Sequence, residues 1–188
     1  IVGKIKGVSV AELAGGRRVE RIPAYVSGLP EDTLAERCEL AQKWQAQGFD
    51  SFKFALPIAD EGAVKELKSL REALGGNARI AADLHWSLTA EESIDLAREL
   101  SSFNPWFLEA PVAPECIEAL RKVAKQCEQK IAAGEEWRTL HEARMRIDRE
   151  ACHIVQPEMG HTGITEFLRI GRHAEKYGLT VIPHATIG

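Results

Sequence analysis

The fold of this protein is decided by one stretch, residues 78–110: ARIAADLHWSLTAEESIDLARELSSFNPWFLEA. An apolar run over residues 78–85 has the length and composition of a buried strand. Residues 89–100 repeat apolar side chains at helical spacing, and Thr89 begins this segment with a glutamate three residues later, which is the sequence signature of a capping box. A second apolar run covers residues 106–110. The stretch therefore predicts a strand–helix–strand unit with parallel strands.

The same unit repeats along the chain at intervals of about 25 residues, the pattern of an α/β protein. Its strands are continuous apolar runs, as expected for parallel strands that are buried on both faces. We predict strands at residues 22–29, 50–56, 78–85, 106–110, 130–134, 152–156 and 180–183, and helices at 31–47, 63–74, 89–100, 114–126, 140–150 and 163–177. Such a sheet either closes into a barrel or stays open and doubly wound. No strand is followed by a glycine-rich phosphate loop, since Gly160–Gly163 lacks the pattern, so we predict a TIM-type (β/α) barrel.

A complete barrel of this kind has eight strands and about 250 residues, whereas the 188 residues here provide seven predicted strands. We therefore expect a barrel that is truncated to about seven strands, lacks its last strand and leaves one edge of the sheet open. We assign residues 1–21 to a segment that leads into the barrel and residues 22–188 to the barrel domain.

The composition is that of an ordinary soluble globular protein, with 45% hydrophobic residues, 28% charged residues and a net charge of −4. Basic and acidic residues are mixed along the chain, which argues against a nucleic-acid or membrane partner. No apolar run approaches the roughly 20 residues of a membrane span, and the first residues have no signal-peptide pattern. The four cysteines form no C-x-x-C pair, so we expect reduced thiols in a cytoplasmic protein.

Barrel active sites are built at the C-terminal ends of the strands, and acidic residues stand there in this sequence. Asp83, Glu109 and Glu135 end three successive predicted strands at intervals of 26 residues, so we expect each repeat to bring its carboxylate to the same place on the rim. Carboxylates that face one another repel, and a divalent cation relieves the repulsion. Three oxygen ligands predict Mg²⁺ rather than Zn²⁺. The plainer explanation is that these acids only cap strand ends or accept hydrogen bonds from helix N-termini.

Several motifs along the chain have the form of a known family. They are Asp83-x-His85, Trp106-Phe-Leu-Glu109-Ala-Pro111, Gly134-Glu135-Glu136-Trp137, Val155-Gln-Pro-Glu158 and Pro183-His184. In this order they resemble the enolase superfamily, and specifically its mandelate racemase subgroup. The resemblance covers the whole chain. It implies Mg²⁺-assisted removal of the proton α to a carboxylate, with Asp83, Glu109 and Glu135 as the metal ligands.

The resemblance also implies roles for other residues. His184 matches the family's base on the seventh strand, which pairs with an acid on the sixth strand that is usually Asp and is here Glu158. His85 matches the histidine with which the subgroup's sugar-acid dehydratases protonate a departing hydroxyl, and we expect it to share a strand face with the first metal ligand. Lys53 keeps the first lysine of a Lys-x-Lys motif and either contacts the substrate electrostatically or only lines the rim. Ala55 replaces the second lysine, which disfavours racemisation because that reaction needs proton donors on both faces.

These residues predict a Mg²⁺-dependent sugar-acid dehydratase, a lyase whose product is a 2-keto-3-deoxy acid. An epimerase, racemase or cycloisomerase of the same superfamily shares the first half of that reaction and remains an alternative. A further alternative is a non-catalytic barrel whose acids no longer bind metal. The plainer explanations for the two histidines are that His184 is a packed polar residue and that His85 supports the site indirectly or lies in an outer loop beside Trp86. The family's N-terminal capping domain has no counterpart among the predicted elements. Family members are commonly homo-oligomers, which we also expect here.

Overall fold

The computed structural model describes residues 1–16 and 20–185. Within these residues, one sheet of seven parallel strands follows the chain order, with each strand paired to the next. The strands are β1 (Val26–Ser27), β2 (Ser51–Ala55), β3 (Arg79–Asp83), β4 (Leu108–Glu109), β5 (Ile131–Ala133), β6 (Ile154–Val155) and β7 (Thr180–Val181). No pairing joins β7 to β1 in this part of the chain, so the sheet is a curved, open portion of a TIM-type barrel. The predicted fold class is confirmed.

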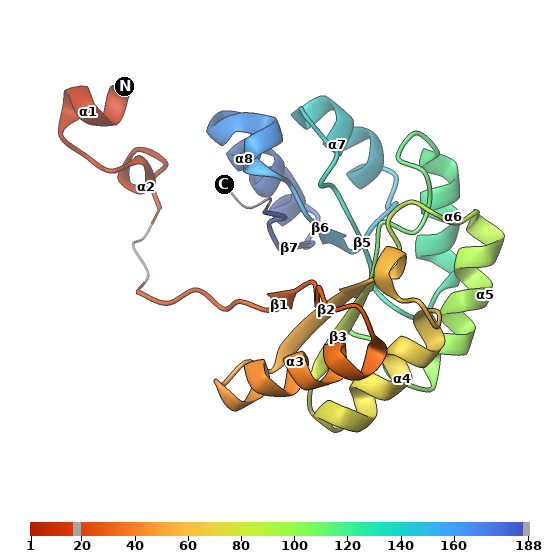
Figure 1. Ribbon diagram of the computed structural model, residues 1–188. Coiled ribbons are helices and arrows are strands. Elements are labelled where there is room, and N and C mark those ends of the chain that lie inside the picture. The colour runs from red at the N-terminus through yellow and green to blue at the C-terminus, as the bar shows by residue number, and fades with distance from the viewer. Residues whose placement is uncertain (17–19, 186–188) are drawn as a thin grey trace.

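Helices connect successive strands and cover the outer side of the sheet (Figure 1). They are α3 (Leu34–Ala46), α4 (Ala63–Leu74), α5 (Ala90–Ser101), α6 (Ile117–Gln126), α7 (Leu140–Ile147) and α8 (Met159–Lys176), with a short 3₁₀ turn, η1 (Leu56–Ile58), after β2. The predicted capping box at Thr89 is present, because its side chain accepts a hydrogen bond from the backbone N–H of Glu92. None of the helices in the described ranges is long and apolar enough to span a bilayer.

Two features of the helices differ from the prediction. The last helix begins at Met159 rather than at Gly163, and the backbone of Gly163 (φ 67°) breaks it into two helical pieces. The lead-in segment contains two short helices, α1 (Val2–Lys6) and α2 (Val10–Leu13). They lie beside α8, because Arg172 of α8 donates to the carbonyl of Ala14 at 3.2 Å and residues of all three helices line one cavity. Periodicity could not reveal them, because helices of four or five residues hold too few turns to show a repeat.

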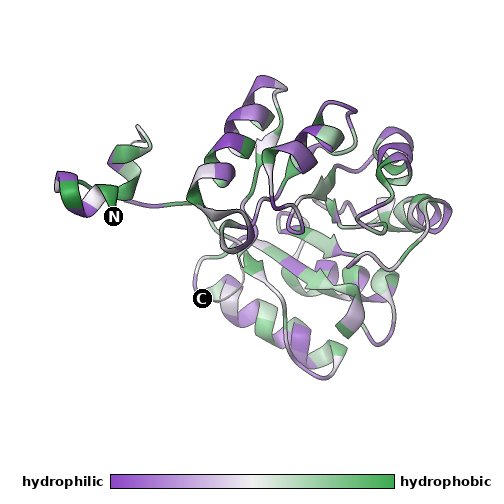
Figure 2. Cartoon of the chain, turned by 90° about the horizontal axis from the view of Figure 1, so that it is seen from above, coloured by the Kyte–Doolittle hydropathy of each residue, from purple (hydrophilic) through white to green (hydrophobic). Residues whose placement is uncertain are grey.

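The sheet has an apolar core on each side. On the outer side, strand residues such as Phe52, Ile80 and Leu108 pack under the helices. The helices carry both hydrophilic (purple) and hydrophobic (green) residues in Figure 2. On the inner side, a smaller cluster is formed by Ala81, Phe107, Ala132 and Ile154. Successive side chains of a strand point to opposite faces. A residue two positions after a member of the inner cluster therefore points into the barrel at its rim.

Candidate active site

Strand alternation places two of the predicted acids at the barrel mouth. Asp83 follows Ala81 by two residues and Glu109 follows Phe107 by two, so both carboxylates point into the barrel. The register of β3 and β4 pairs Asp83 directly with Glu109. Both side chains are buried, Glu109 with only 1% exposure. The 26-residue interval between them thus brings them to the same level of the rim, as predicted.

Glu135 reaches the rim in a different way. The β5 partner of Glu109 is Ala132, so Glu135 stands three residues beyond that level and past the end of β5. The chain turns at Gly134, whose φ of 136° is in a region that side chains rarely adopt. The expectation that equal spacing gives equal rim positions is therefore wrong for Glu135, because this turn interrupts the strand alternation.

A lysine and a glutamine engage both oxygens of Glu109. The Nζ atom of Lys53, on β2, donates a hydrogen bond to Glu109 Oε1 and lies 3.8 Å from Asp83 Oδ2. The Nε2 atom of Gln156, directly after β6, donates to Glu109 Oε2 at 2.7 Å. The ring of Tyr25 lies below the ammonium group, with Nζ 5.9 Å from the ring centroid. The sequence prediction included Lys53 but missed Gln156 and Tyr25, although Gln156 belongs to one of the recognised motifs.

The predicted histidine–carboxylate pair is present in the structure. A parallel bridge pairs Glu158 with His184, which extends the β6–β7 alignment to the rim. The Nδ1 atom of His184 lies 2.9 Å from Oε2 of Glu158. The other ring nitrogen, Nε2, lies 3.3 Å from Oε2 of Glu135. The structure therefore joins the histidine–carboxylate pair to the acidic rim through Glu135.

Three side chains at the rim are close enough to hold one metal ion. Glu109, Glu135 and His184 each offer a ligand atom, and these atoms lie within 4.8 Å of one another. Glu135 Oε2 is buried, and apart from His184 Nε2 at 3.3 Å no hydrogen-bond donor lies near it among the described residues, so it suits a cation. Asp83 is outside this group, and its Oδ2 atom lies 3.8 Å from the Nζ atom of Lys53. A donor set dominated by carboxylate oxygens fits a hard cation such as Mg²⁺.

Burial raises the pKa of two of the rim acids. For Asp83 the main cause is loss of hydration, followed by the negative charge of Glu109. Burial likewise raises the pKa of Glu135 to about 7. Burial alone would lower the pKa of Lys53, but the negative charge of Glu109 leads the effects that outweigh it, and this pKa is raised. The rim thus concentrates negative charge in a poorly hydrated place, where a cation is favourable.

The expectation that His85 shares a strand face with Asp83 is wrong. Strand β3 ends at Asp83 rather than at residue 85, and His85 has φ 49° and the following Trp86 has φ 56°. The backbone N–H of His85 donates to Asp83 Oδ1 at 3.0 Å. Its ring is exposed beside that of Trp86, with centroids 4.8 Å apart. His85 therefore stays beside the metal-ligand candidate through its backbone, while its imidazole reaches solvent at the edge of the site.

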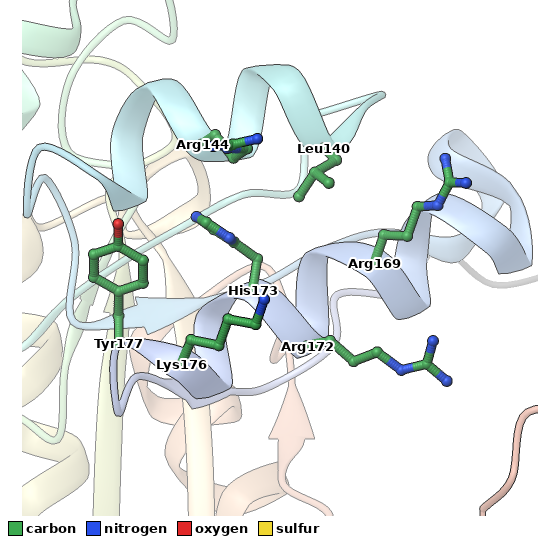
Figure 3. A pocket seen from close by; sticks show the side chains of 7 residues that line it. All are labelled: Leu140, Arg144, Arg169, Arg172, His173, Lys176 and Tyr177. Carbon is green, nitrogen blue, oxygen red and sulfur yellow. The ribbon is translucent and has the colours of Figure 1, made fainter.

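The outer helical layer also contains a cavity, away from the strand ends. This cavity of about 440 Å³ opens between α7 and α8 (Figure 3). It is lined by Leu140, Arg144, Arg169, Arg172, His173, Lys176 and Tyr177. Salt bridges to Asp148 and Glu166 offset part of its positive charge. No group that combines a base with several carboxylates faces this cavity among the described residues, so the chemistry points to the rim instead.

The fold and the rim together define a barrel of the enolase type. The family model described as enolase C-terminal domain-like matches residues 36–188. This chain belongs to that family, within the enolase superfamily.

Comparisons with individual proteins agree with this assignment. The chain is 34% identical to a D-galactonate dehydratase from Ralstonia nicotianae, over all of this chain and 52% of that protein. It is 55% identical to the crystal structure of a putative isomerase from Sinorhizobium meliloti, over all of this chain and 49% of that one, with a TM-score of 0.96. It is 53% identical to a member of the enolase superfamily from Agrobacterium tumefaciens, over all of this chain and 48% of that one, with the same TM-score. The chain thus spans about half the length of these relatives.

Proposed function

We propose that this chain carries the active site of a Mg²⁺-dependent sugar-acid dehydratase. The observation that supports this proposal best is the orientation of His184 by Glu158. A carboxylate at Nδ1 fixes the tautomer and stabilises the protonated ring. The other nitrogen, Nε2, is then free to act as a base beside the rim carboxylates.

The metal would be held by the carboxylates of Asp83, Glu109 and Glu135. Glu109 and Glu135 belong to the close group at the rim, and the third member of that group, His184, is assigned the role of base instead of metal ligand. When bound, Mg²⁺ acts as a Lewis acid that stabilises negative charge on the substrate carboxylate. Lys53 adds a fixed positive charge at the same end of the site, since burial and its salt bridge to Glu109 hold its ammonium group in place. These groups orient the substrate so that its C2–H bond faces His184.

The residues of the chain then carry the proton transfers. His184 Nε2 takes the proton from C2, and the electron pair of the C–H bond remains in the substrate beside its carboxylate. The C3–O bond breaks as that pair forms a C2–C3 double bond. His85, or His184 after it has been protonated, gives a proton to the departing hydroxyl, which leaves as water. The resulting enol tautomerises to a 2-keto-3-deoxy acid.

The similarity to D-galactonate dehydratase supports a sugar-acid substrate. An isomerase is the second candidate, because a structure with 55% identity is named a putative isomerase. Both reactions begin with removal of the α proton. Ala55, at the end of β2, carries no group that could donate a proton to the opposite face, which argues against a racemase with two bases.

A substrate screen with a matched control tests this proposal. The purified protein is incubated with Mg²⁺ and a library of sugar acids that includes D-galactonate, and 2-keto acid formation is measured. We expect turnover with at least one sugar acid, and a loss of about 10²- to 10⁴-fold in His184→Asn, since a general base contributes about that factor. His141→Asn, on the exposed face of α7, should keep full activity.

The same samples in D₂O separate the two candidates. Exchange of the C2 proton without formation of any 2-keto acid would favour the isomerase. Absence of both exchange and product with every sugar acid would contradict the proposed chemistry and favour a non-catalytic barrel.

A further inference from the structure

We infer that Gln156 is a positioning residue for the metal ligand Glu109. This inference rests on the proposed function, because it assigns a task toward the same metal site. Gln156 is 1% exposed, and its amide Nε2 donates to Glu109 Oε2 at 2.7 Å. A hydrogen bond from a buried amide to a buried carboxylate is both short and directional, so it restricts the carboxylate to one orientation.

The direction of this hydrogen bond is determined by its partner. An ionised carboxylate has only acceptor atoms, so the NH₂ end of the amide must face Glu109. The opposite orientation would set the amide oxygen against Oε2 and add repulsion between two buried oxygen atoms. Gln156 therefore supplies a fixed donor and no charge, whereas Lys53 supplies a charged donor at Oε1.

The backbone at the end of β5 holds Gln156 in place through two contacts. Its N–H donates to the carbonyl of Ala133 at 2.9 Å, which ties it to the end of β5. At Gly134 a Cβ atom would come within 3.0 Å of the Gln156 backbone nitrogen, so the two chain segments are in close contact there. An amide whose backbone is held on a packed strand end can fix its partner more precisely than one on a free loop.

Lys53 cannot do this alone. Its ammonium group binds the other oxygen, Oε1, and faces Asp83 as well as Glu109. Removal of the Gln156 donor would leave Oε2 buried without that partner and let the carboxylate rotate about its terminal torsion. Residues of this kind, which hold a metal ligand without touching the metal, typically change metal affinity by about 10- to 100-fold when they are replaced.

Metal binding to the purified protein tests the inference without any substrate. Isothermal titration with Mg²⁺ is compared for the parent, Gln156→Met and Gln156→Glu, with far-UV circular dichroism as a check of folding. We expect Mg²⁺ affinity to fall by about 10- to 100-fold in Gln156→Met, which keeps the size but loses the donor. Gln156→Glu should be at least as weak, because it replaces a donor by an acceptor. If the Met variant does not fold, the Glu variant, which keeps size and polarity, provides the same comparison.

Gln45→Met is the matched control, because Gln45 donates to a backbone carbonyl, Leu74 O, on the outer layer at 2.8 Å. It should bind Mg²⁺ like the parent. In assays at saturating Mg²⁺, Gln156→Met should regain most of its turnover, since it keeps the histidine and its carboxylate partner. A folded Gln156 variant with the Mg²⁺ affinity of the parent would overturn this inference alone. Failure of the parent to bind Mg²⁺ would overturn the proposed function and this inference with it.

Discussion

A buried ion pair between α3 and α4 gives the sharpest test of what stabilises this barrel. Arg37 is fully buried, and its Nε and Nη2 atoms donate to the two oxygens of Glu66 at 2.8 Å each. Its remaining hydrogen bonds reach the carbonyls of Glu31 and Asp32 and the half-exposed carboxylate of Asp60. One guanidinium group therefore joins two helices and the loops after β1 and β2.

The size of the effect follows from the partners that remain. Removal of one member of a buried ion pair costs about 3–5 kcal/mol, because the other charge stays buried. Glu66→Met leaves Arg37 with three of its partners, so we expect a loss near 3 kcal/mol. Arg37→Met leaves the buried carboxylate of Glu66 without its guanidinium and removes every cross-link, so we expect a loss nearer 5 kcal/mol. In the Arg37→Met background, Glu66→Met should lower the unfolding free energy by almost nothing further. The difference between its effects in the two backgrounds gives a coupling energy of about 3 kcal/mol.

Urea unfolding followed by circular dichroism measures these free energies in a double-mutant cycle. The control pair is Lys68 and Glu72, both on α4. Lys68 Nζ lies 3.9 Å from Glu72 Oε1, and both side chains are more than half exposed. Their coupling should stay below about 0.5 kcal/mol, as is usual for surface pairs. A coupling of less than about 1 kcal/mol for Arg37 and Glu66 would refute the assignment of this pair as a main link between the two helices.

Three other predictions concern single positions. Gly134→Ala should lower the unfolding free energy by about 1–3 kcal/mol, since the positive φ and the close contact with the Gln156 backbone both oppose a side chain. The control is Gly171→Ala, which lies in open space on α8 and should be neutral or stabilising in the same urea titration. His153 accepts a hydrogen bond from the backbone N–H of Ile131, which begins β5, and burial is the main cause that lowers its pKa below the usual value of about 6.5. Its contribution to stability is therefore present above about pH 6.5 and is lost as the pH falls through the folded-state pKa. The dependence of the melting temperature on pH in this range should become flatter in His153→Ala. Burial raises the pKa of the Cys152 thiol to about 12, so a thiol reagent at pH 8 should modify exposed Cys116 and leave Cys152 untouched until the protein unfolds.

Most of the fold could be predicted from the sequence, because its signals are local. Apolar runs, helical spacing and the capping box at Thr89 each depend on residues within one element. They predicted seven strands, all of which are present, although β1, β4, β6 and β7 are observed as only two residues each. The strand ends were less accurate, since the pairing that defines a strand depends on its neighbours rather than on its own composition.

The contacts of the site depend on information that the sequence does not show directly. Lys53 and Gln156 meet at Glu109 although they lie 56 and 47 residues from it. The motif around Gln156 marks the end of a predicted strand but does not show which distant side chain Gln156 contacts. The sequence placed His85 on the strand face of Asp83 by alternation, and the left-handed backbone at His85 ended that alternation.

The positions of the acids show when a repeat interval predicts a contact. Asp83 and Glu109, like Glu158 and His184, are 26 residues apart, and in both cases the strands pair at that same offset, so the side chains meet at one level. Strands β4 and β5 pair at a shorter offset, because Leu108 lies beside Ile131. The interval from Glu109 to Glu135 therefore exceeds the register by three residues, which extend beyond β5 through the turn at Gly134. This excess lets Glu135 reach both Glu109 and His184, so the turn at Gly134 links the acidic residues of the rim to the histidine–carboxylate pair.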